Sequence, residues 1–292
     1  MPESKNANSA EKPPDPLVEA MKTHEGNLNA AVKAISRRVE TNAKGETTLL
    51  FIHYAVNVGD EGFELIGDLE FLEYLDATDS PITNKGLKPI GQLEYLKELI
   101  IDISEVGDDG LEHLAEMKLL RRLSLSATRV SDPGLKHLVG LSTLESLNLS
   151  CTSVTHRGLK HLRKLHNLIH LDLGENNIRD DGVAHLRKLT RLQSLTLNYN
   201  RITDEGAQWL KGFEEMKILN IKGNFITDRM VADLIESMPT ATINRYARRP
   251  PLLLSVTTKR AGLFAFFLGS SFSIGPFGTA LQVNPHEADV RW

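Results

Sequence analysis

The sequence predicts an α/β fold, a right-handed solenoid in which parallel strands line the concave face of a curve and short helices cover the convex face. Two observations lead to this prediction. A 24-residue unit recurs eight times without insertion or deletion from Thr48 to Pro239. Within each unit, an apolar pattern of period two gives way to a helical pattern. Since one strand and one helix cannot bury their own apolar faces, stacking of the units has to supply the core.

The chain before the repeats divides into two parts. Residues 1–16 are polar and have no apolar stretch after a basic start, so we expect a disordered segment and no signal peptide. Residues 17–47 lie within "DPLVEAMKTHEGNLNAAVKAISRRVE" and its continuation. The spacing of their apolar residues predicts one or two amphipathic helices, which would form a helical N-terminal cap on the first strand.

Each unit begins with alternating apolar residues, the pattern of a short strand with one buried face. In the fourth copy these residues are Leu120, Leu123 and Leu125. Counting back by 24 residues places Phe51 in the buried column of the first copy and Ile52 in an outward column. The outward residues of all copies are expected to share the concave face.

Two polar columns follow the strand. Small polar side chains stand where the chain turns away and can bond to free backbone groups there: Ser80, Ser104, Thr128, Thr152, Asn176, Asn200 and Asn224. The second column is mostly acidic, and because Pro133 directly follows Asp132, we predict that it caps the helix N-termini. Its members are Asp60, Asn84, Asp108, Asp132, Asp180, Asp204 and Asp228, with His156 as the exception.

The second half of each unit predicts a short helix with inward leucines at three-residue steps. A histidine column flanks this stripe, at His113, His137, His161 and His185. A zinc ion requires ligands that converge at about 2.0–2.1 Å, whereas side chains one helix apart point in parallel. Proline and tryptophan occupy the same column in other copies. We therefore interpret the histidines as half-buried packing between helices, with a metal or proton-sensing role as the alternative.

The pattern in "LIHLDLGENNIRDDGVAHL" and "LQSLTLNYNRITDEGAQWL" resembles the LxxLxLxxNxI frame of the leucine-rich-repeat family. The helical half is similar to the cysteine-containing and ribonuclease-inhibitor-like subclasses, including the repeats of F-box proteins and long bacterial arrays. The resemblance covers residues 48–239 and implies a right-handed leucine-rich-repeat solenoid. It implies no specific function, because the frame is scaffold and the variable positions carry recognition.

Motifs and composition argue against catalysis. The single cysteine, Cys151, excludes an intramolecular disulfide and a cysteine-built zinc site, and it fits a reducing compartment. No phosphate-binding glycine loop, GxSxG motif or HExxH motif occurs. The net charge is −4, and residues 48–239 carry more acidic than basic side chains, which disfavours nucleic acid as a partner. We therefore expect a cytoplasmic monomer with no catalytic residues, no metal and no cofactor.

Aromatic residues beside charged ones are typical of protein-binding hot spots. Two sets of outward-facing residues fit this description. The first patch comprises Tyr54, Tyr74, Asp76, Asp79 and Asp102. The second patch comprises His170, Asp172, Glu175, Asn198 and Tyr199. The alternative for any of these residues is an ordinary solvated sheet face.

Residues 240–292 leave the repeat frame and predict an irregular or apolar tail. No Asp, Glu, Lys or Arg occurs between Arg260 and Glu287. Residues 261–283 are long enough to span a bilayer, although four glycines, three serines and a proline interrupt them.

The sequence thus predicts a non-catalytic scaffold for protein–protein interaction, which binds a protein partner on the concave face of the solenoid. One alternative is a regulatory or substrate-recognition subunit, resembling F-box-type ligase adaptors or cyclase regulators. The other is a membrane-tethered binder that uses residues 261–283.

Overall fold

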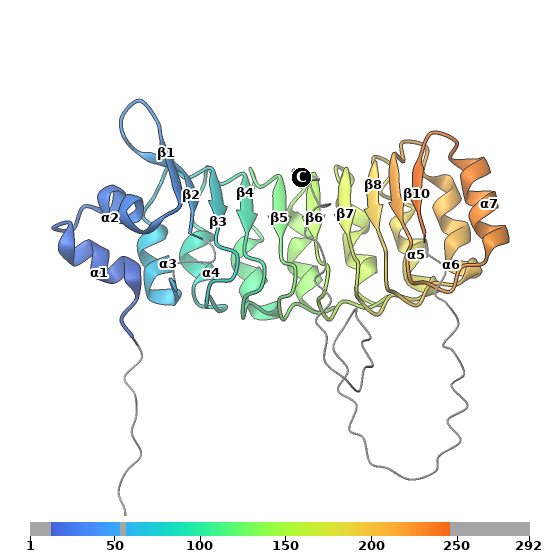
Figure 1. Ribbon diagram of the computed structural model, residues 1–292, viewed down its shortest axis with the longest axis horizontal. Helices are drawn as coiled ribbons and strands as arrows, with labels where there is room; N and C mark the ends of the chain where they lie inside the picture. The colour runs from blue at the N-terminus through green and yellow to red at the C-terminus, as the bar shows by residue number, and fades with distance from the viewer. Residues whose placement is uncertain (1–12, 53–56, 246–292) are drawn as a thin grey trace, which may run out of the picture. The chain divides into compact units, whose positions relative to one another are not determined.

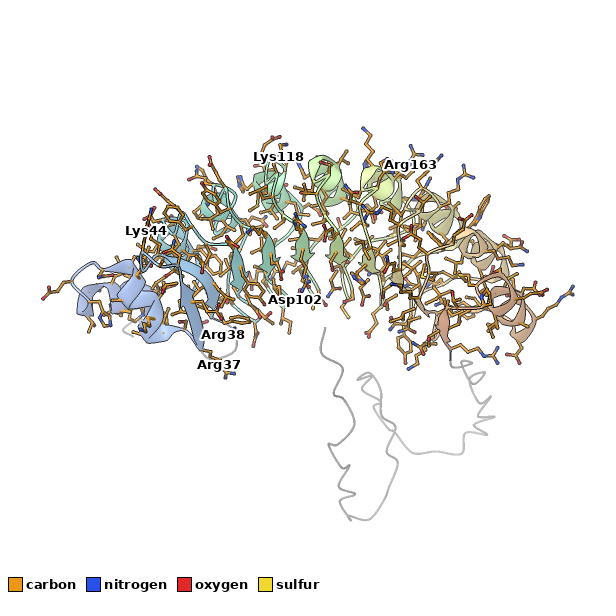
Figure 2. All side chains as sticks on the ribbon, turned by 90° about the horizontal axis from the view of Figure 1, so that it is seen from above. Arg37, Arg38, Lys44, Asp102, Lys118 and Arg163 are labelled. Atoms are coloured by element: carbon orange, nitrogen blue, oxygen red, sulfur yellow. The ribbon has the colours of Figure 1, made fainter. Side chains whose placement is uncertain are left out.

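A computed structural model describes residues 13–52 and 57–245, all within one compact unit, Met1–Pro250. The described residues form a ten-stranded sheet whose strands follow one another in chain order, with short helices along one side (Figure 1). From β2 to β10 every neighbouring pair is parallel. The repeat array is an arc with its strands on the inner side and its helices on the outer side (Figure 2). The predicted solenoid is confirmed.

The strands are short and recur with the repeat: β1 Arg38–Thr41, β2 Thr47–Phe51, β3 Tyr74–Asp76, β4 Glu98–Ile100, β5 Arg122–Ser124, β6 Ser146–Asn148, β7 His170–Asp172, β8 Ser194–Thr196, β9 Ile218–Asn220 and β10 Thr242–Asn244. The helices that follow them are α3 Asp60–Ile66, α4 Leu87–Ile90, η1 Asp108–Leu114, η2 Gly134–Gly140, η3 Leu159–Lys164, α5 Asp180–Leu186, α6 Asp204–Ala207 with η4 Gln208–Gly212, and α7 Asp228–Ser237. The η elements are 3₁₀ helices.

Two short helices precede the sheet, α1 Pro16–Thr23 and α2 Leu28–Ile35. Asp15 caps α1 by accepting a hydrogen bond of 2.9 Å from the Leu17 amide. Asn27 caps α2 in the same way, at 3.0 Å from the Ala30 amide. Leu17 is fully buried, so the helices close the N-terminal end of the core.

The segment 17–47 is only partly helical, because its last part forms β1, which pairs antiparallel with β2. Gly45 makes the reversal possible, since its φ of +81° lies in the left-handed region that glycine occupies without strain. The hairpin covers the edge that β2 would otherwise expose. The apolar pattern of this segment does not reveal that role.

The first repeat is one residue longer than the others between its strand and its helix. Leu50 pairs with Leu75 and Phe51 pairs with Asp76, so strict 24-residue periodicity gave the wrong register here. Leu50 and Ile52 are fully buried, whereas Phe51 is partly exposed. Because side chains alternate along a strand, a shift of one residue exchanges the two faces. Phe51 therefore faces the concave side, contrary to the prediction.

The predicted small polar column bonds to backbone groups, as expected, from Ser104 to Asn224. Ser80 is the exception, because its buried hydroxyl has no hydrogen-bond partner among the described residues. The Asn200 amide group donates to the Leu173 carbonyl at 2.8 Å, and its Oδ1 accepts from the Ile178 amide at 2.9 Å. Asn224 repeats this pattern one turn later. In an earlier repeat, the Thr128 hydroxyl donates a hydrogen bond of 2.7 Å to one carbonyl, that of Leu125. The asparagines thus connect adjacent repeats, whereas this hydroxyl bond lies within one repeat.

The acidic column has a different role from the predicted one. Asp108 accepts hydrogen bonds from the amide and the hydroxyl of Ser131 in the next repeat, at 2.7 and 2.6 Å. Asp132 does the same with Thr155. The prediction of helix caps was wrong, because each of these residues, at or just before the helix start, turns its carboxylate toward the following repeat, where two donors converge on it. We call these contacts the inter-repeat brackets, and they comprise Asp60–Thr83, Asp108–Ser131, Asp132–Thr155, Asp180–Thr203 and Asp204–Thr227.

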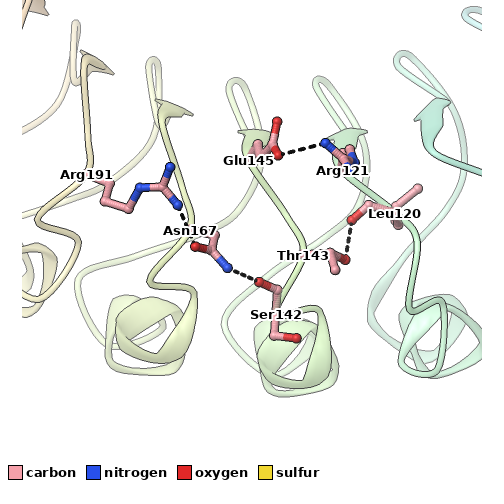
Figure 3. Close-up of polar contacts among 7 residues, drawn as sticks. All are labelled: Leu120, Arg121, Ser142, Thr143, Glu145, Asn167 and Arg191. Atoms are coloured by element: carbon pink, nitrogen blue, oxygen red, sulfur yellow. Dashed lines mark hydrogen bonds and ion pairs between the residues drawn. The ribbon is translucent and has the colours of Figure 1, made fainter.

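A further set of polar contacts connects adjacent repeats where the chain enters the strands (Figure 3). Arg121 and Glu145 form an ion pair of 3.2 Å. Asn167 donates to the Ser142 carbonyl at 2.7 Å and accepts from Arg191 at 2.6 Å. Polar links between repeats therefore occur both before and after the strands.

The C-terminal end continues the repeat strand beyond the eighth copy. β10 pairs parallel with β9, and the Ile221 amide donates to the Asn244 carbonyl at 3.0 Å. Residues 240–245 of the predicted tail are therefore ordered as part of the sheet, because the strand frame persists after Pro239. Residues 246–292, which include the apolar segment 261–283, lie outside the described residues, as do residues 1–12.

Candidate interaction surface

Strand pairing aligns the outward side chains into columns across the concave face. One column runs through Tyr74, Glu98, Arg122, Ser146, His170, Ser194 and Ile218. The next runs through Asp76, Ile100, Ser124, Asn148, Asp172, Thr196 and Asn220. Asp102, just beyond β4, lies on the same inner side of the arc (Figure 2).

Aromatic and charged side chains meet at the N-terminal end of this face. The Tyr74 ring lies 4.7 Å from the Phe51 ring, centroid to centroid. The Arg38 guanidinium stands 5.7 Å from the centroid of Phe51, within cation–π range. Beside them, Glu98 and Arg122 form an ion pair of 3.4 Å. We call these five residues, from β1 to β5, the N-terminal row.

The surroundings of Tyr74 alter its ionisation. Burial raises the pKa of its phenol to about 12, and the carboxylates of Asp76 and Glu98 add to the effect. The hydroxyl is therefore protonated at neutral pH and can donate a hydrogen bond to a partner.

The acidic residues of the first patch differ in how they are held. Asp76 accepts from the amide and the hydroxyl of Thr78, at 3.0 and 2.8 Å. Asp102 accepts from the Ser124 hydroxyl and the Ser126 amide, at 2.6 and 2.7 Å. Burial raises the pKa of the Asp102 carboxyl, against these two hydrogen bonds.

The other two residues of the first patch lie apart from this network or outside the described structure. Asp79 is exposed, with a φ of +60°, at the rim of the face. Tyr54 falls within residues 53–56, outside the described residues, so its predicted role stays a prediction.

The second patch lies on β7 and on the turns that follow β7 and β8. The Glu175 amide donates to the Asn198 carbonyl at 2.8 Å, and Asp172 accepts from the Gly174 amide at 2.8 Å. Tyr199 is 51% exposed, and its ring occupies the space that a side chain at position 223 would need. Glycine at 223 therefore makes room for an exposed aromatic ring at the rim of the concave face.

Burial also governs the titratable groups of the second patch. It lowers the pKa of the His170 imidazole, helped by the positive charge of Arg122. It raises the pKa of the Asp172 carboxyl, against the hydrogen bond from Gly174. Both groups are thus biased toward their neutral forms.

The histidine column and Cys151 are the two features of the sequence that could carry reactivity. Their surroundings favour a packing role for the histidines and low reactivity for the thiol. Each histidine of the flanking column is partly buried between helices, as the packing interpretation predicts. Among the described residues no group of three or more His, Cys, Asp or Glu side chains could hold a metal ion. Burial and the Glu175 carboxylate raise the pKa of the Cys151 thiol, which lowers its nucleophilicity at neutral pH.

Four residues of the N-terminal row, Arg38, Phe51, Glu98 and Arg122, were absent from the predicted patches for identifiable reasons. Phe51 was assigned to the buried column because of the shifted register in the first repeat. Arg38 belongs to a strand in a segment predicted to be helical. Arg122 stood in the predicted outward column, and its pairing with Glu98 became evident only from the geometry.

Comparison with known proteins agrees with the fold. The model of the leucine rich repeat family matches residues 142–202, and no curated protein matches the chain. Among solved structures, an internalin C2 (inlC2) from Listeria monocytogenes is 24% identical, with a TM-score of 0.56, over 80% of this chain and 94% of that one. An internalin (inlF) from the same organism is 22% identical, with a TM-score of 0.53, over 67% of this chain and 60% of that one.

A plant peptide hormone receptor, RGFR1, solved in complex with RGF2, is 17% identical with a TM-score of 0.51. It matches over 71% of this chain and 36% of the receptor chain. The chain thus spans less than two thirds of the length of inlF and of RGFR1. Together with the ten-stranded sheet, these likenesses show that the protein has the leucine-rich-repeat solenoid fold.

The helices of the described part of the chain are short. None of those within residues 13–52 and 57–245 is long and apolar enough to cross a membrane.

Proposed function

We propose that the protein is a non-catalytic interaction scaffold that binds a protein partner on its concave face, with the N-terminal row at the centre of the contact. The observation that supports this proposal is the stacking of Arg38, Phe51 and Tyr74 beside the Glu98–Arg122 ion pair. Tyrosine and arginine are enriched at binding hot spots. Because neighbouring strands already hold these side chains, binding would lose little conformational entropy.

The acidic residues indicate what the partner would present. Asp76 and Asp102 lie beside the row, and Asp79 is exposed at the rim of the same face, so a partner with basic side chains at the matching positions would be favoured. The second patch, with the exposed ring of Tyr199, would extend the contact toward the C-terminal repeats. In this proposal the chain acts as a monomer in the cytoplasm, a compartment that its single cysteine fits.

The proposal is tested by capturing partners from the native lysate on the immobilised full chain. A captured protein would then be titrated against the parent and against the double variant Tyr74→Ala/Arg122→Ala. We expect the double variant to bind at least about tenfold more weakly, which corresponds to about 1.4 kcal/mol. Loss of an aromatic and an arginine side chain at a hot spot typically exceeds that value.

The matched control changes the same residue types outside the concave columns, as Tyr95→Ala/Arg121→Ala. Tyr95 is 47% exposed, and Arg121 forms an ion pair like that of Arg122. Binding should survive in the control, and both variants should keep the circular dichroism spectrum of the parent. Equal affinity of the parent and the Tyr74→Ala/Arg122→Ala variant would exclude the N-terminal row as the binding site.

A further inference from the structure

The charges of the repeats are strongly segregated along the chain. Residues 48–100 contain three basic and ten acidic side chains, whereas residues 151–200 contain eight basic and four acidic ones. The helical halves of repeats four to six bring basic side chains together on η2, on η3 and the residues before it, and directly after α5. We call this set the basic convex surface, and it comprises Lys136, Arg157, Lys160, Arg163, Lys164, Arg187 and Lys188.

All seven side chains of the basic convex surface are exposed. Arg163 lies on the outer side of the arc, opposite the concave face (Figure 2). Arg163 and Arg187 are 24 residues apart, as are Lys164 and Lys188, so each pair occupies equivalent positions in adjacent repeats. Because neighbouring helices lie roughly 8–10 Å apart, the cations form parallel rows across the convex face.

These cations lack the partners that basic residues have elsewhere in the array. Lys97, Arg121 and Arg129 each pair with a glutamate of an adjacent repeat. Within residues 13–52 and 57–245, by contrast, no ion pair involves Lys160, Arg163, Lys164 or Lys188.

The nearby acidic residues are already engaged. In the segment 157–164 no acidic residue occurs, and α5 contributes only Asp180 and Asp181. Asp180 belongs to an inter-repeat bracket with Thr203, and Asp181 lies 3.7 Å from His156. The positive charge of the surface is therefore not neutralised by its immediate surroundings.

The positive charge of this surface also affects the pKa of two histidines of the flanking column. Burial lowers the pKa of His161, and the charges of Lys160 and Lys136 lower it further, against a raising contribution from Asp132. Burial also lowers the pKa of His185, as do Arg163, Arg187 and Lys160, against a raising contribution from Asp181. Both imidazoles are thus biased toward their neutral forms, first by burial and then by cations of their own and of adjacent segments.

The composition of this surface differs from that of a protein-binding hot spot. Lysine is depleted in the cores of protein interfaces, and aromatic residues are enriched there. Here lysine and arginine dominate, and the large apolar side chain beside them is Trp209, which is 44% exposed and lies 5.4 Å under the Arg187 guanidinium. Such a surface fits a polyanion better than a protein.

We propose that the basic convex surface binds the anionic phospholipid headgroups of a bilayer. Charged lipids diffuse in the plane of a bilayer and can gather beneath cations of any spacing, whereas the phosphates of a nucleic acid have a fixed spacing. A convex patch on the outer side of an arc can approach a flat surface. Trp209 beside Arg187 also suits the membrane interface, where tryptophan is enriched.

Bound in this way, the solenoid would keep its concave face turned away from the bilayer and open to a protein partner. The inference therefore goes beyond the proposed scaffold function and does not depend on which protein occupies the concave face.

The test is cosedimentation of the full chain with vesicles of phosphatidylcholine alone or of equimolar phosphatidylcholine and phosphatidylserine. We expect binding to the anionic vesicles that weakens as salt is raised, because exposed charges are screened. The variant Arg163→Glu/Lys164→Glu/Lys188→Glu should lose affinity on the order of 100-fold, since each basic residue near an anionic bilayer contributes about fivefold.

The matched control is Lys33→Glu/Lys44→Glu/Arg229→Glu, which changes the net charge equally at exposed positions on α2, the β1–β2 turn and α7. It should retain most of the affinity. Three results would overturn the proposal: equal loss in both variants, equal binding to neutral vesicles, or tighter binding of the parent to duplex DNA than to the anionic vesicles. The last result would assign the surface to nucleic acid instead.

Discussion

Single residues on the concave face owe their properties to partial burial in a polar network. Asp102 shows the effect, because its carboxylate accepts two hydrogen bonds from β5 and the turn after it, and yet its pKa is raised. Desolvation of the charged form therefore outweighs the two donors. A carboxylate in this state is a neutral acid over a wider pH range than an exposed aspartate and is easily perturbed by a bound cation.

This balance predicts the pH dependence of one variant. Asp102→Asn keeps a side-chain oxygen for Ser124 and Ser126 but cannot ionise. In the parent, the folded state holds the Asp102 proton above the ordinary aspartate pKa of about 3.9, so this group's contribution to stability falls as pH rises through the higher native pKa. The stability of Asp102→Asn relative to the parent should therefore increase between about pH 3 and pH 7, as measured by urea unfolding.

Asp172→Asn should behave in the same direction, because burial raises the pKa of that carboxyl too. A stability difference that stays constant across the pH range would show that neither carboxyl is desolvated in the folded protein.

The elements of the solenoid are joined by the inter-repeat brackets, and two joints lack theirs. Between repeats two and three, Asn84 accepts a single hydrogen bond of 2.7 Å from the Gly107 amide. Between repeats five and six, His156 replaces the aspartate and Arg179 replaces the threonine or serine that would bind it. The Nδ1 atom of His156 is buried and has no hydrogen-bond partner among the described residues. Neighbouring joints each have two hydrogen bonds to a carboxylate, so this joint is expected to be the weakest in the array.

Restoring the bracket should stabilise the protein. Hydrogen bonds to charged groups contribute about 1.5–3 kcal/mol each, so His156→Asp/Arg179→Thr should raise the free energy of unfolding by about 2 kcal/mol. In this variant, amide hydrogen exchange should slow at the substituted position 179 and along α5. The matched control, Asp132→His/Thr155→Arg, removes the adjacent bracket and should lower stability by a similar amount. If the repaired joint exchanged as fast as before, the bracket would not be what holds adjacent repeats together.

At the scale of the whole molecule, the fold was predictable because repetition averages out local ambiguity. Eight aligned copies specify which residues are buried, and Leu123, Leu147 and Leu195 are at most 1% exposed. Repetition also explains the one error of register. Nothing in the spacing of the later copies shows the extra residue between Ile52 and Val58, and it reverses the face of Phe51.

The candidate site was less predictable because it depends on contacts that break the repeat. The Arg38 contact comes from a hairpin outside the array. At the rim of the face, one position of the repeat has a positive φ, in the left-handed region. It is occupied by residues such as Ile103, Cys151 and Tyr199, whereas glycine or asparagine is the usual residue in that region. Their conformation is imposed by hydrogen bonds to the next repeat, such as that from the Ile103 amide to the Ser126 carbonyl at 2.8 Å. Only the assembled stack reveals such positions.

An array in which each repeat contacts only its neighbours should respond differently to central and terminal defects. Leu147 in β6 and Leu219 in β9 occupy the same buried column, and both are almost fully buried. Leu→Ala at either position should cost about 2–5 kcal/mol in local packing. Since β9 has only β10 beyond it, Leu219→Ala should let the last turn fray and speed amide exchange mainly in residues 194–245. Leu147→Ala weakens contacts on both sides and should lower the unfolding midpoint of the whole array. Identical exchange patterns in the two variants would show that the array unfolds as a single cooperative unit, with no independent end.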